Sequence, residues 1–273
     1  MKGRYQRVML VALGVATVVA LLAVWLREPS YQGRTLSEWV DLLYTTNHTE
    51  AMNSISAIGP SAIPFLFKKA RHEGTAVQRF HRAIWPKLPT ILKQRLPVPR
   101  PLDLNFPGKI GNALMAVGGQ EELPQLIAAL KDRDPRVRHV AIEAIKYMHL
   151  SRYRREKYRG MKFDAAVPVL CELLSDPDDR VRGSALITLG GMGLEAKPAV
   201  PAFIATLRFG TNGYIAEVRA TAAWALGQVG PDARMAVPWL RQSLGDTNAV
   251  MRQKAREALE KIDPDAAAKE DMK

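Results

Sequence analysis

The hydrophobic and polar positions of residues 116–263 repeat as pairs of amphipathic helices. Large apolar residues stand two and six positions after a recurring proline, an i, i+4 pair that marks one face of a helix. Alanine and then leucine or isoleucine stand three and seven positions after a recurring arginine, which marks a second helix packed closely on the first. The landmarks are Pro124, Pro168, Pro201 and Pro238, and Arg138, Arg182, Arg219 and Arg252. The pattern predicts helical hairpins, each with a helix A that begins near the proline and a helix B that begins near the arginine.

The ends of these helices carry the expected capping residues. Asp134, Asp178 and Asn248 each precede an arginine landmark by four positions, where a short polar side chain caps the first turn of helix B. Gly193 and Gly230 each follow an arginine landmark by eleven positions, where glycine ends a helix. Local signals and the hydrophobic pattern therefore predict the same helices.

Fainter units precede these four. Residues 113–118 fit the helix B pattern, with Ile110 in place of the arginine, and residues 54–60 fit it again before a helix A at 61–66. A helix at 36–44 would cover the first unit, since terminal repeats are usually atypical. We therefore predict an all-α chain, an α-solenoid over residues 36–263 followed by a disordered tail at 264–273.

The N-terminal segment at residues 8–26 contains no charged residue. As a helix it would be about 28 Å long, close to the hydrocarbon thickness of a bilayer. Residues 1–7 carry three basic residues, and the positive-inside rule places them in the cytoplasm. We expect a single-pass anchor at 8–26, a linker at 27–35, and the solenoid outside the cell membrane. A cleaved signal peptide and a secreted protein are the alternative.

The net charge of +12 is concentrated in two places. Residues 66–109 carry ten Lys and Arg against two acidic residues, and residues 146–162 carry seven against one. Each region contains an irregular stretch that interrupts the repeats. The insertion at 86–107 has six prolines, which predicts an extended, polyproline-like conformation, and the other lies at 147–162. Insertions in a solenoid tend to gather on one edge, so we expect one shared basic surface.

The second insertion combines arginine and lysine with tyrosine. A guanidinium group pairs with phosphate or carboxylate through two hydrogen bonds, and tyrosine adds a hydroxyl or a stacking face. A solvated helix extension, with charges that only aid solubility, is the alternative. The candidate residues for binding an anion or partner are Arg152, Tyr153, Arg154, Arg155, Lys157, Tyr158 and Arg159.

Residues that could carry catalysis or bind a cofactor are sparse. The histidines form no HExxH or zinc-ligand spacing, no Gly-x-Ser-x-Gly occurs, and the glycines at 190–193 end a helix rather than cradle a phosphate. The single cysteine, Cys171, lies in an apolar run and is expected to be a packed residue. We therefore expect no enzyme activity, no cofactor and no metal.

Two stretches of the chain resemble a known family. SDPDDRVRGSALITLGGMG (175–193) and AEVRATAAWALGQVG (216–230) resemble bacterial HEAT repeats, a group that includes phycobilisome-lyase-like repeats. Residues 31–39 resemble the start of exported bacterial HEAT-repeat proteins. The resemblance implies a solenoid in which repeated Asp and Arg residues bond between units and are structural. These ladder residues are Asp132, Asp176, Asp246, Arg138, Arg182, Arg219 and Arg252.

The function that fits these observations is a membrane-tethered scaffold for protein–protein interaction. Its basic surface would receive an acidic partner or an anionic component of the cell envelope. A nucleic-acid-binding or DNA-modifying protein of the HEAT type is the alternative, and it requires a cytosolic solenoid and salt-dependent affinity. An exported enzyme with an unrecognised site is a third possibility.

Overall fold

A computed structural model describes residues 28–71, 84–93, 106–152, 154–209 and 215–271 of the chain. The predicted cytoplasmic N-terminus and membrane segment, residues 1–7 and 8–26, lie outside the described residues. Within the described ranges, no helix is both long and apolar enough to cross a membrane.

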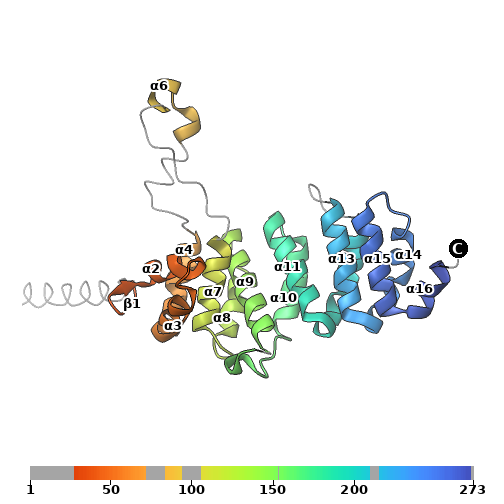
Figure 1. The fold of residues 1–273 in the computed structure, drawn as a ribbon, viewed down its shortest axis with the longest axis horizontal. Helices are drawn as coiled ribbons and strands as arrows, with labels where there is room; N and C mark the ends of the chain where they lie inside the picture. The colour runs from red at the N-terminus through yellow and green to blue at the C-terminus, as the bar shows by residue number, and fades with distance from the viewer. Residues whose placement is uncertain (1–27, 72–83, 94–105, 153, 210–214, 272–273) are drawn as a thin grey trace, which may run out of the picture.

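The chain is an all-α solenoid of paired helices that stand side by side along its long axis (Figure 1). One layer holds the B helices, which are α3 (His48–Ile58), α7 (Phe106–Val117), α9 (Pro135–Ser151), α11 (Asp179–Met192), α13 (Ile215–Val229) and α15 (Ala249–Ile262). The other holds the A helices, which are α2 (Leu36–Asp41), α4 (Ile63–Arg71), α8 (Leu123–Ala129), α10 (Ala166–Glu172), α12 (Val200–Phe209) and α14 (Val237–Ser243). Short 3₁₀ turns adjoin many of them, namely η1 (Leu42–Tyr44), η2 (Pro60–Ala62), η5 (Leu173–Ser175), η6 (Gly193–Ala199) and η7 (Gly230–Ala236).

Each unit packs on itself and on the next unit. Among the described elements, α3 packs on α7, α7 on α9, α9 on α11, α11 on α13, and α13 on α15. Each A helix packs on the B helix that follows it, and α12 also touches α14. Since each helical pair hides its apolar face only against its neighbours, the architecture is that of a repeat array. The prediction of stacked helical hairpins is confirmed.

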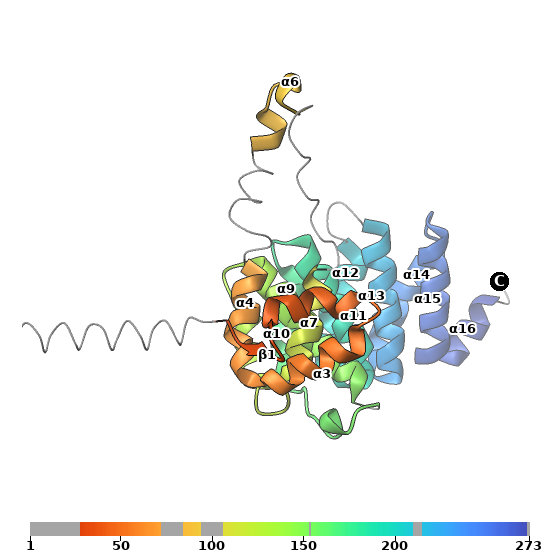
Figure 2. The same ribbon diagram turned by 60° about the vertical axis from the view of Figure 1, so that its left-hand side comes forward.

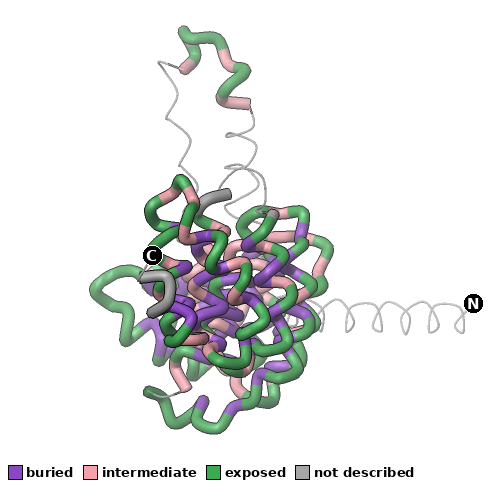
Figure 3. The backbone as a smooth tube through the Cα atoms, turned by 90° about the vertical axis from the view of Figure 1, so that its right-hand side faces the viewer, coloured by how far each residue is buried: buried purple, intermediate pink, exposed green. Residues whose placement is uncertain are grey.

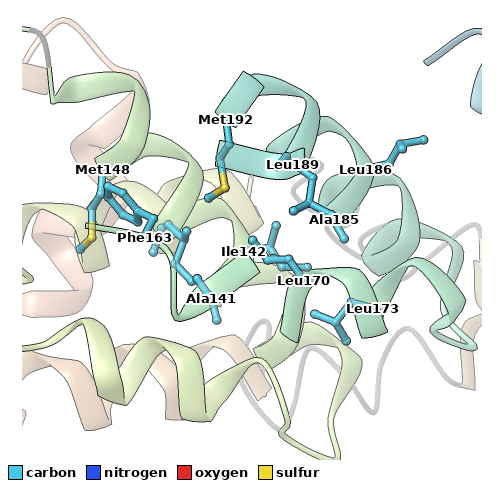
Figure 4. Packing of buried hydrophobic residues seen from close by; sticks show 14 of the residues in the cluster. Ala141, Ile142, Met148, Phe163, Leu170, Leu173, Ala185, Leu186, Leu189 and Met192 are labelled. Atoms are coloured by element: carbon cyan, nitrogen blue, oxygen red, sulfur yellow. The ribbon is translucent and has the colours of Figure 1, made fainter. Parts of the chain in front are cut away.

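The core lies between the two layers. Looking along the stack, buried positions concentrate where helices face one another and exposed positions lie outside (Figure 3). Figure 4 shows Ala141 and Ile142 of α9 near Leu170 of α10 and Ala185 and Leu189 of α11, and all five are buried. Alanine recurs at these contacts because a small side chain lets two helices approach closely.

The predicted helix ends are confirmed. The side chain of Asp134 accepts a hydrogen bond from the backbone N–H of Arg136 at 3.0 Å, and Asn248 accepts one from Met251 at 3.0 Å. Asp178 caps α11 in the same way. At the other end, Gly193 has a φ of 61° and Gly230 a φ of 74°, a region that favours glycine.

Two terminal segments differ from expectation. Residues 30–35, expected as part of a linker, form an antiparallel hairpin of β1 (Ser30–Tyr31) and β2 (Arg34–Thr35). Residues 264–271, expected as a disordered tail, form α16 (Pro264–Asp271). Proline begins this helix without losing a hydrogen bond, Asp263 accepts the N–H of Ala266 at 3.1 Å, and Ala266 and Ala267 are buried.

The proline-rich insertion is not extended where the structure describes it. Trp85–Lys87 form η3 and Thr90–Lys93 form α6, while Pro107 lies in the first turn of α7. Proline is tolerated in the first turn of a helix, so the number of prolines alone does not exclude helices. Residues 94–105 of this insertion lie outside the described residues.

The two basic insertions project from opposite edges of the stack. Turns from an A helix to its B helix form one edge, the A-to-B edge, and turns from a B helix to the next A helix form the other, the B-to-A edge. The insertion that contains α6 joins α4 to α7, and the residues after α9 join it to α10. Figures 1 and 2 show α6 and this second segment on opposite sides. The expectation of one shared basic surface is therefore wrong for the described parts.

Candidate functional site

The segment that joins α9 to α10, residues 152–165 and here called the basic loop, is anchored by buried side chains. Tyr158 is 1% exposed, and its hydroxyl donates to the carbonyl oxygen of Met115 at 2.5 Å. Met161 and Phe163 are also buried. The backbone N–H of Lys162 donates to the side-chain oxygen of Gln120 at 3.2 Å. These contacts fix the loop on the end of the preceding unit.

The seven candidate binding residues divide into two groups. Tyr158 is a core residue, and burial raises its pKa to about 12. Lys157 donates from Nζ to the carbonyl oxygen of Ala116 at 2.8 Å. Arg152 pairs with Glu195 of η6. Arg154, Arg155 and Arg159 are exposed, and Tyr153 lies outside the described residues.

The backbone N–H groups of the three exposed arginines are hydrogen-bonded. The N–H groups of Arg154 and Arg155 donate to the carbonyl oxygen of Ser151, the last residue of α9, at 3.0 and 2.8 Å. Glu156–Tyr158 form η4, and Arg159 donates its N–H to the carbonyl oxygen of Glu156 at 3.0 Å. Arg154, Arg155 and Arg159 are therefore exposed on one loop, whereas Arg152, Lys157 and Tyr158 bond to neighbouring parts of the fold.

A buried histidine lies behind the basic loop. The ring of His149 is edge-on to Phe163, with centroids 5.3 Å apart, and Nε2 lies 3.5 Å from Oε2 of Glu195. Burial lowers the pKa of His149, the positive charge of Arg152 lowers it further, and Glu195 opposes both. His149, at the end of α9, therefore contacts both the basic loop, through Phe163, and η6, through Glu195.

The ladder residues lie on the A-to-B edge. Nη2 of Arg138 donates to Oδ1 of Asp176 in the next unit at 2.7 Å, and Nη2 of Arg219 lies 2.8 Å from Oδ2 of Asp246. Arg71, which the sequence pattern did not include, pairs in the same way with Asp132. Each aspartate also accepts the backbone N–H two residues later, at 2.9 Å in all three units. One carboxylate therefore shapes its own turn and bonds to the preceding unit.

Arg182 differs from Arg138 and Arg219. It donates to the carbonyl oxygen of Asp176 at 2.6 Å and pairs with Asp179, both within its own unit. The sequence has Gly213 where the other units have the ladder aspartate, six positions before the arginine landmark. Arg252 likewise bonds within its own unit, to the carbonyl oxygen of Asp246 at 2.8 Å.

A polar network that the sequence did not reveal links the B helices α9 and α11. The carboxylate of Glu143, whose side chain is 9% exposed, accepts two bonds from Nζ of Lys146 at 2.6 and 2.7 Å. Ser184 of α11 donates to it at 3.3 Å. Burial, and then the charge of Glu143, raises the pKa of Tyr147. Glu143 can pack here because residue 111 is glycine. A Cβ at Gly111 would lie only 2.6 Å from Cβ of Glu143.

Comparison with known families decides the class of the protein. The sequence profile of HEAT repeats matches residues 123–212 and 200–271, which together make up more than half of the chain. The chain belongs to the HEAT-repeat family. It is therefore a HEAT-repeat scaffold, a class that is typically non-catalytic.

Solved structures of engineered and designed proteins are similar to this HEAT chain. Two engineered proteins are 20% and 21% identical to it, with TM-scores of 0.46 and 0.44, and the matches cover 84% and 83% of this chain and 96% and 68% of theirs. A designed armadillo repeat protein is 16% identical with a TM-score of 0.45, over 84% of this chain and 100% of that one. No curated protein matches the chain. The assignment therefore rests on the family match.

In the part of the chain that the structure describes, few side chains could bind a metal ion or take part in redox chemistry. In these ranges, no group of three or more His, Cys, Asp and Glu side chains is placed to hold a metal ion. Cys171 is half-buried, and burial, with a further contribution from Glu172, raises the pKa of its thiol. A thiol with a raised pKa is a weak nucleophile at neutral pH.

Proposed function

We propose that this HEAT-repeat chain is a membrane-tethered scaffold that captures an acidic protein partner on its basic loop. The fold is consistent with protein–protein interaction. The tether is the uncharged segment at residues 8–26, with the solenoid outside the cytoplasm. The observation that carries the proposal is the anchored basic loop, which holds Arg154, Arg155 and Arg159 exposed on buried supports.

The anchoring favours binding because the loop is ordered before a partner arrives. A partner that meets an ordered loop does not lose the free energy otherwise spent on ordering it. Each guanidinium group can pair with a carboxylate through two parallel hydrogen bonds. Neighbouring positive charges also accelerate the approach of an acidic surface, an effect that weakens as salt increases.

A charge-reversal experiment tests the loop. The full chain carries Arg154→Glu, Arg155→Glu and Arg159→Glu, and a matched control carries Arg133→Glu, Arg180→Glu and Arg256→Glu, which are also exposed. Proteins captured from the native membrane fraction are identified by mass spectrometry at low and high salt. We expect at least one acidic protein to be captured by the wild type and the control, released by salt, and lost from the loop variant.

The outcome that contradicts the proposal is an unchanged set of captured proteins in the loop variant. Binding of the wild type to vesicles with anionic lipid, in place of an acidic protein and with the same loss in the loop variant, would instead assign the loop to the membrane surface. A reporter fused to the C-terminus tests the tether separately. Activity only outside the cytoplasm is expected, and activity in the cytoplasm would favour the nucleic-acid alternative.

A further inference from the structure

The two ends of the basic loop meet at one buried side chain. Arg152, at the start of the loop, pairs with Oε1 of Glu195. Phe163, near the end of the loop, packs edge-on against the ring of His149, with the centroids 5.3 Å apart. Nε2 of His149 in turn lies 3.5 Å from Oε2 of Glu195. The three exposed arginines lie between these contacts along the chain, so the contacts around His149 close the loop that carries them.

The ring of His149 is buried without a full set of hydrogen bonds. The residue is only 4% exposed, and Phe163 beside it is also buried. At 3.5 Å from Glu195, Nε2 lies beyond the usual length of a hydrogen bond, and it has no hydrogen-bond partner among the described residues. A charged group is far more costly to bury without a partner than a neutral one. The closed loop therefore fits the neutral ring.

The charges around the ring also disfavour its protonation. Among the described residues, the charged groups that act on His149 are Arg152 at the end of α9 and Glu195 of η6, while the loop presents the uncharged Phe163. Since Arg152 already pairs with Glu195, a protonated ring would place two cations beside one carboxylate. Burial lowers the pKa of His149, Arg152 lowers it further, and Glu195 opposes both.

Opening of the loop would remove the cost of protonation. Once Phe163 moves away, water reaches His149 and its pKa returns toward the ordinary value of about 6.5. The opened form then binds a proton more readily than the closed form does. As the pH falls below about 6.5, the equilibrium therefore shifts toward the opened loop, until the pH passes below the lowered pKa of the closed form.

We propose that His149 is an acid-sensitive switch for the basic loop: the neutral ring keeps Phe163 packed and the loop closed, and the protonated ring releases them. Tyr158, whose hydroxyl bonds to Met115, keeps the loop attached to α7 in both states. A partner that meets an opened loop must order it again, which lowers affinity. Acid should therefore weaken partner capture. This last step rests on the proposed function, whereas the opening of the loop does not.

Hydrogen exchange of the full chain at pH 7.5 and pH 5.5 tests the switch without a partner. The reporters are the backbone N–H groups of Met161, Lys162 and Ala166, each of which donates a hydrogen bond in or beside the loop. After correction for the pH dependence of intrinsic exchange, we expect their protection to fall about fivefold in acid. Uptake of one proton sets a limit of about tenfold over this range. Helices α13 and α15 should keep their protection.

Two variants that cannot titrate show whether His149 is the cause. In His149→Gln and in His149→Phe, the protection of the reporters should change by less than about twofold between the two pH values. The phenylalanine variant keeps an aromatic ring beside Phe163, so the test does not depend on one substitution. His139→Gln is the matched control. His139 lies near the start of the same helix, 3.9 Å from Glu143, and burial lowers its pKa too. This control should respond to acid like the wild type.

Unchanged protection in the wild type overturns the proposal, as does an equal loss in the wild type and both His149 variants. An acid response that His139→Gln abolishes would also overturn it, as would a loss shared by all the helices, because acid would then unfold the chain. Partner capture is a separate result. A wild type that captures no acidic protein at either pH contradicts the proposed function, whereas the exchange measurement alone decides whether the switch exists.

Discussion

Arginine is used differently on the two edges of the stack. On the A-to-B edge, the side chain of Arg138 is 10% exposed and that of its partner Asp176 is 4% exposed, so the pair is buried between two units. On the B-to-A edge, Arg154, Arg155 and Arg159 are exposed on a loop whose Tyr158 is buried. The comparison teaches that an arginine holds units together where a carboxylate of a neighbouring unit lies within reach, as Asp176 does for Arg138 and Glu195 does for Arg152, so local charge alone does not show which arginines remain exposed.

The largest effect is expected from the A-to-B edge. Asp176→Ala leaves Arg138 buried without its carboxylate and removes an acceptor from the turn before α11, so we expect a loss of about 3 kcal/mol in the free energy of unfolding. Urea denaturation measures it. Asp179→Ala is the control. The carboxylate of Asp179 is 61% exposed, so its loss should lower the free energy of unfolding by less than about 0.5 kcal/mol. Equal losses in the free energy of unfolding would show that the ion pair between Arg138 and Asp176 stabilises the fold no more than an exposed ion pair does.

A smaller effect is expected from the support of the basic loop. Tyr158→Phe keeps the buried ring but leaves the carbonyl oxygen of Met115 without its donor, which should cost about 1 kcal/mol. Hydrogen exchange should rise in residues 154–162 while α13 and α15 stay protected. Unchanged exchange in the loop would mean that the hydroxyl does not fix it.

A pH-dependent effect is expected from His149. Its pKa is lowered in the folded chain, chiefly by burial, so the unfolded chain binds the proton more readily once the pH falls below about 6.5. Stability is therefore lost as the pH falls from that value through the lowered pKa. The melting temperature of the wild type should drop more between pH 7 and pH 5 than that of His149→Gln. Parallel curves for the two proteins would contradict this role.

The smallest effect on stability is expected from the exposed arginines. Arg154→Glu, Arg155→Glu and Arg159→Glu together should change the free energy of unfolding by less than about 1 kcal/mol, since surface substitutions rarely matter more. Urea denaturation measures it, alongside partner capture. A large loss of stability would place these side chains in the fold, and the contrast between the two edges would fail.

The sequence predicted the helical pairs well because each signal repeats. The proline and arginine landmarks, the caps at Asp134 and Asn248, and the alanines of the B helices all describe the same units. The expectation of one shared basic surface was wrong because charge alone does not show from which edge of the stack an insertion projects. Counting whether a helix A or a helix B precedes each insertion would have separated α6 from the basic loop.

The candidate site was predictable only in part. Arg154, Arg155 and Arg159 could be named from local charge, but nothing in an irregular segment distinguishes the buried Tyr158 from a surface tyrosine. The network around Glu143 left a readable signal, since His139, Glu143 and Tyr147 follow one another at four-residue intervals on one face of α9. The hollow that Arg219 lines from one unit and Trp239 lines from the next depends on contact between two units, which no single repeat shows.

The most direct measurement is hydrogen exchange of the full chain with and without Asp176→Ala. If each unit touches only its neighbours, loss of this one contact should raise exchange in α9, α10 and α11, on either side of the junction, and leave α14 and α15 as protected as in the wild type. A uniform rise in exchange across all the helices would show a single cooperative globule and would contradict the stacked architecture.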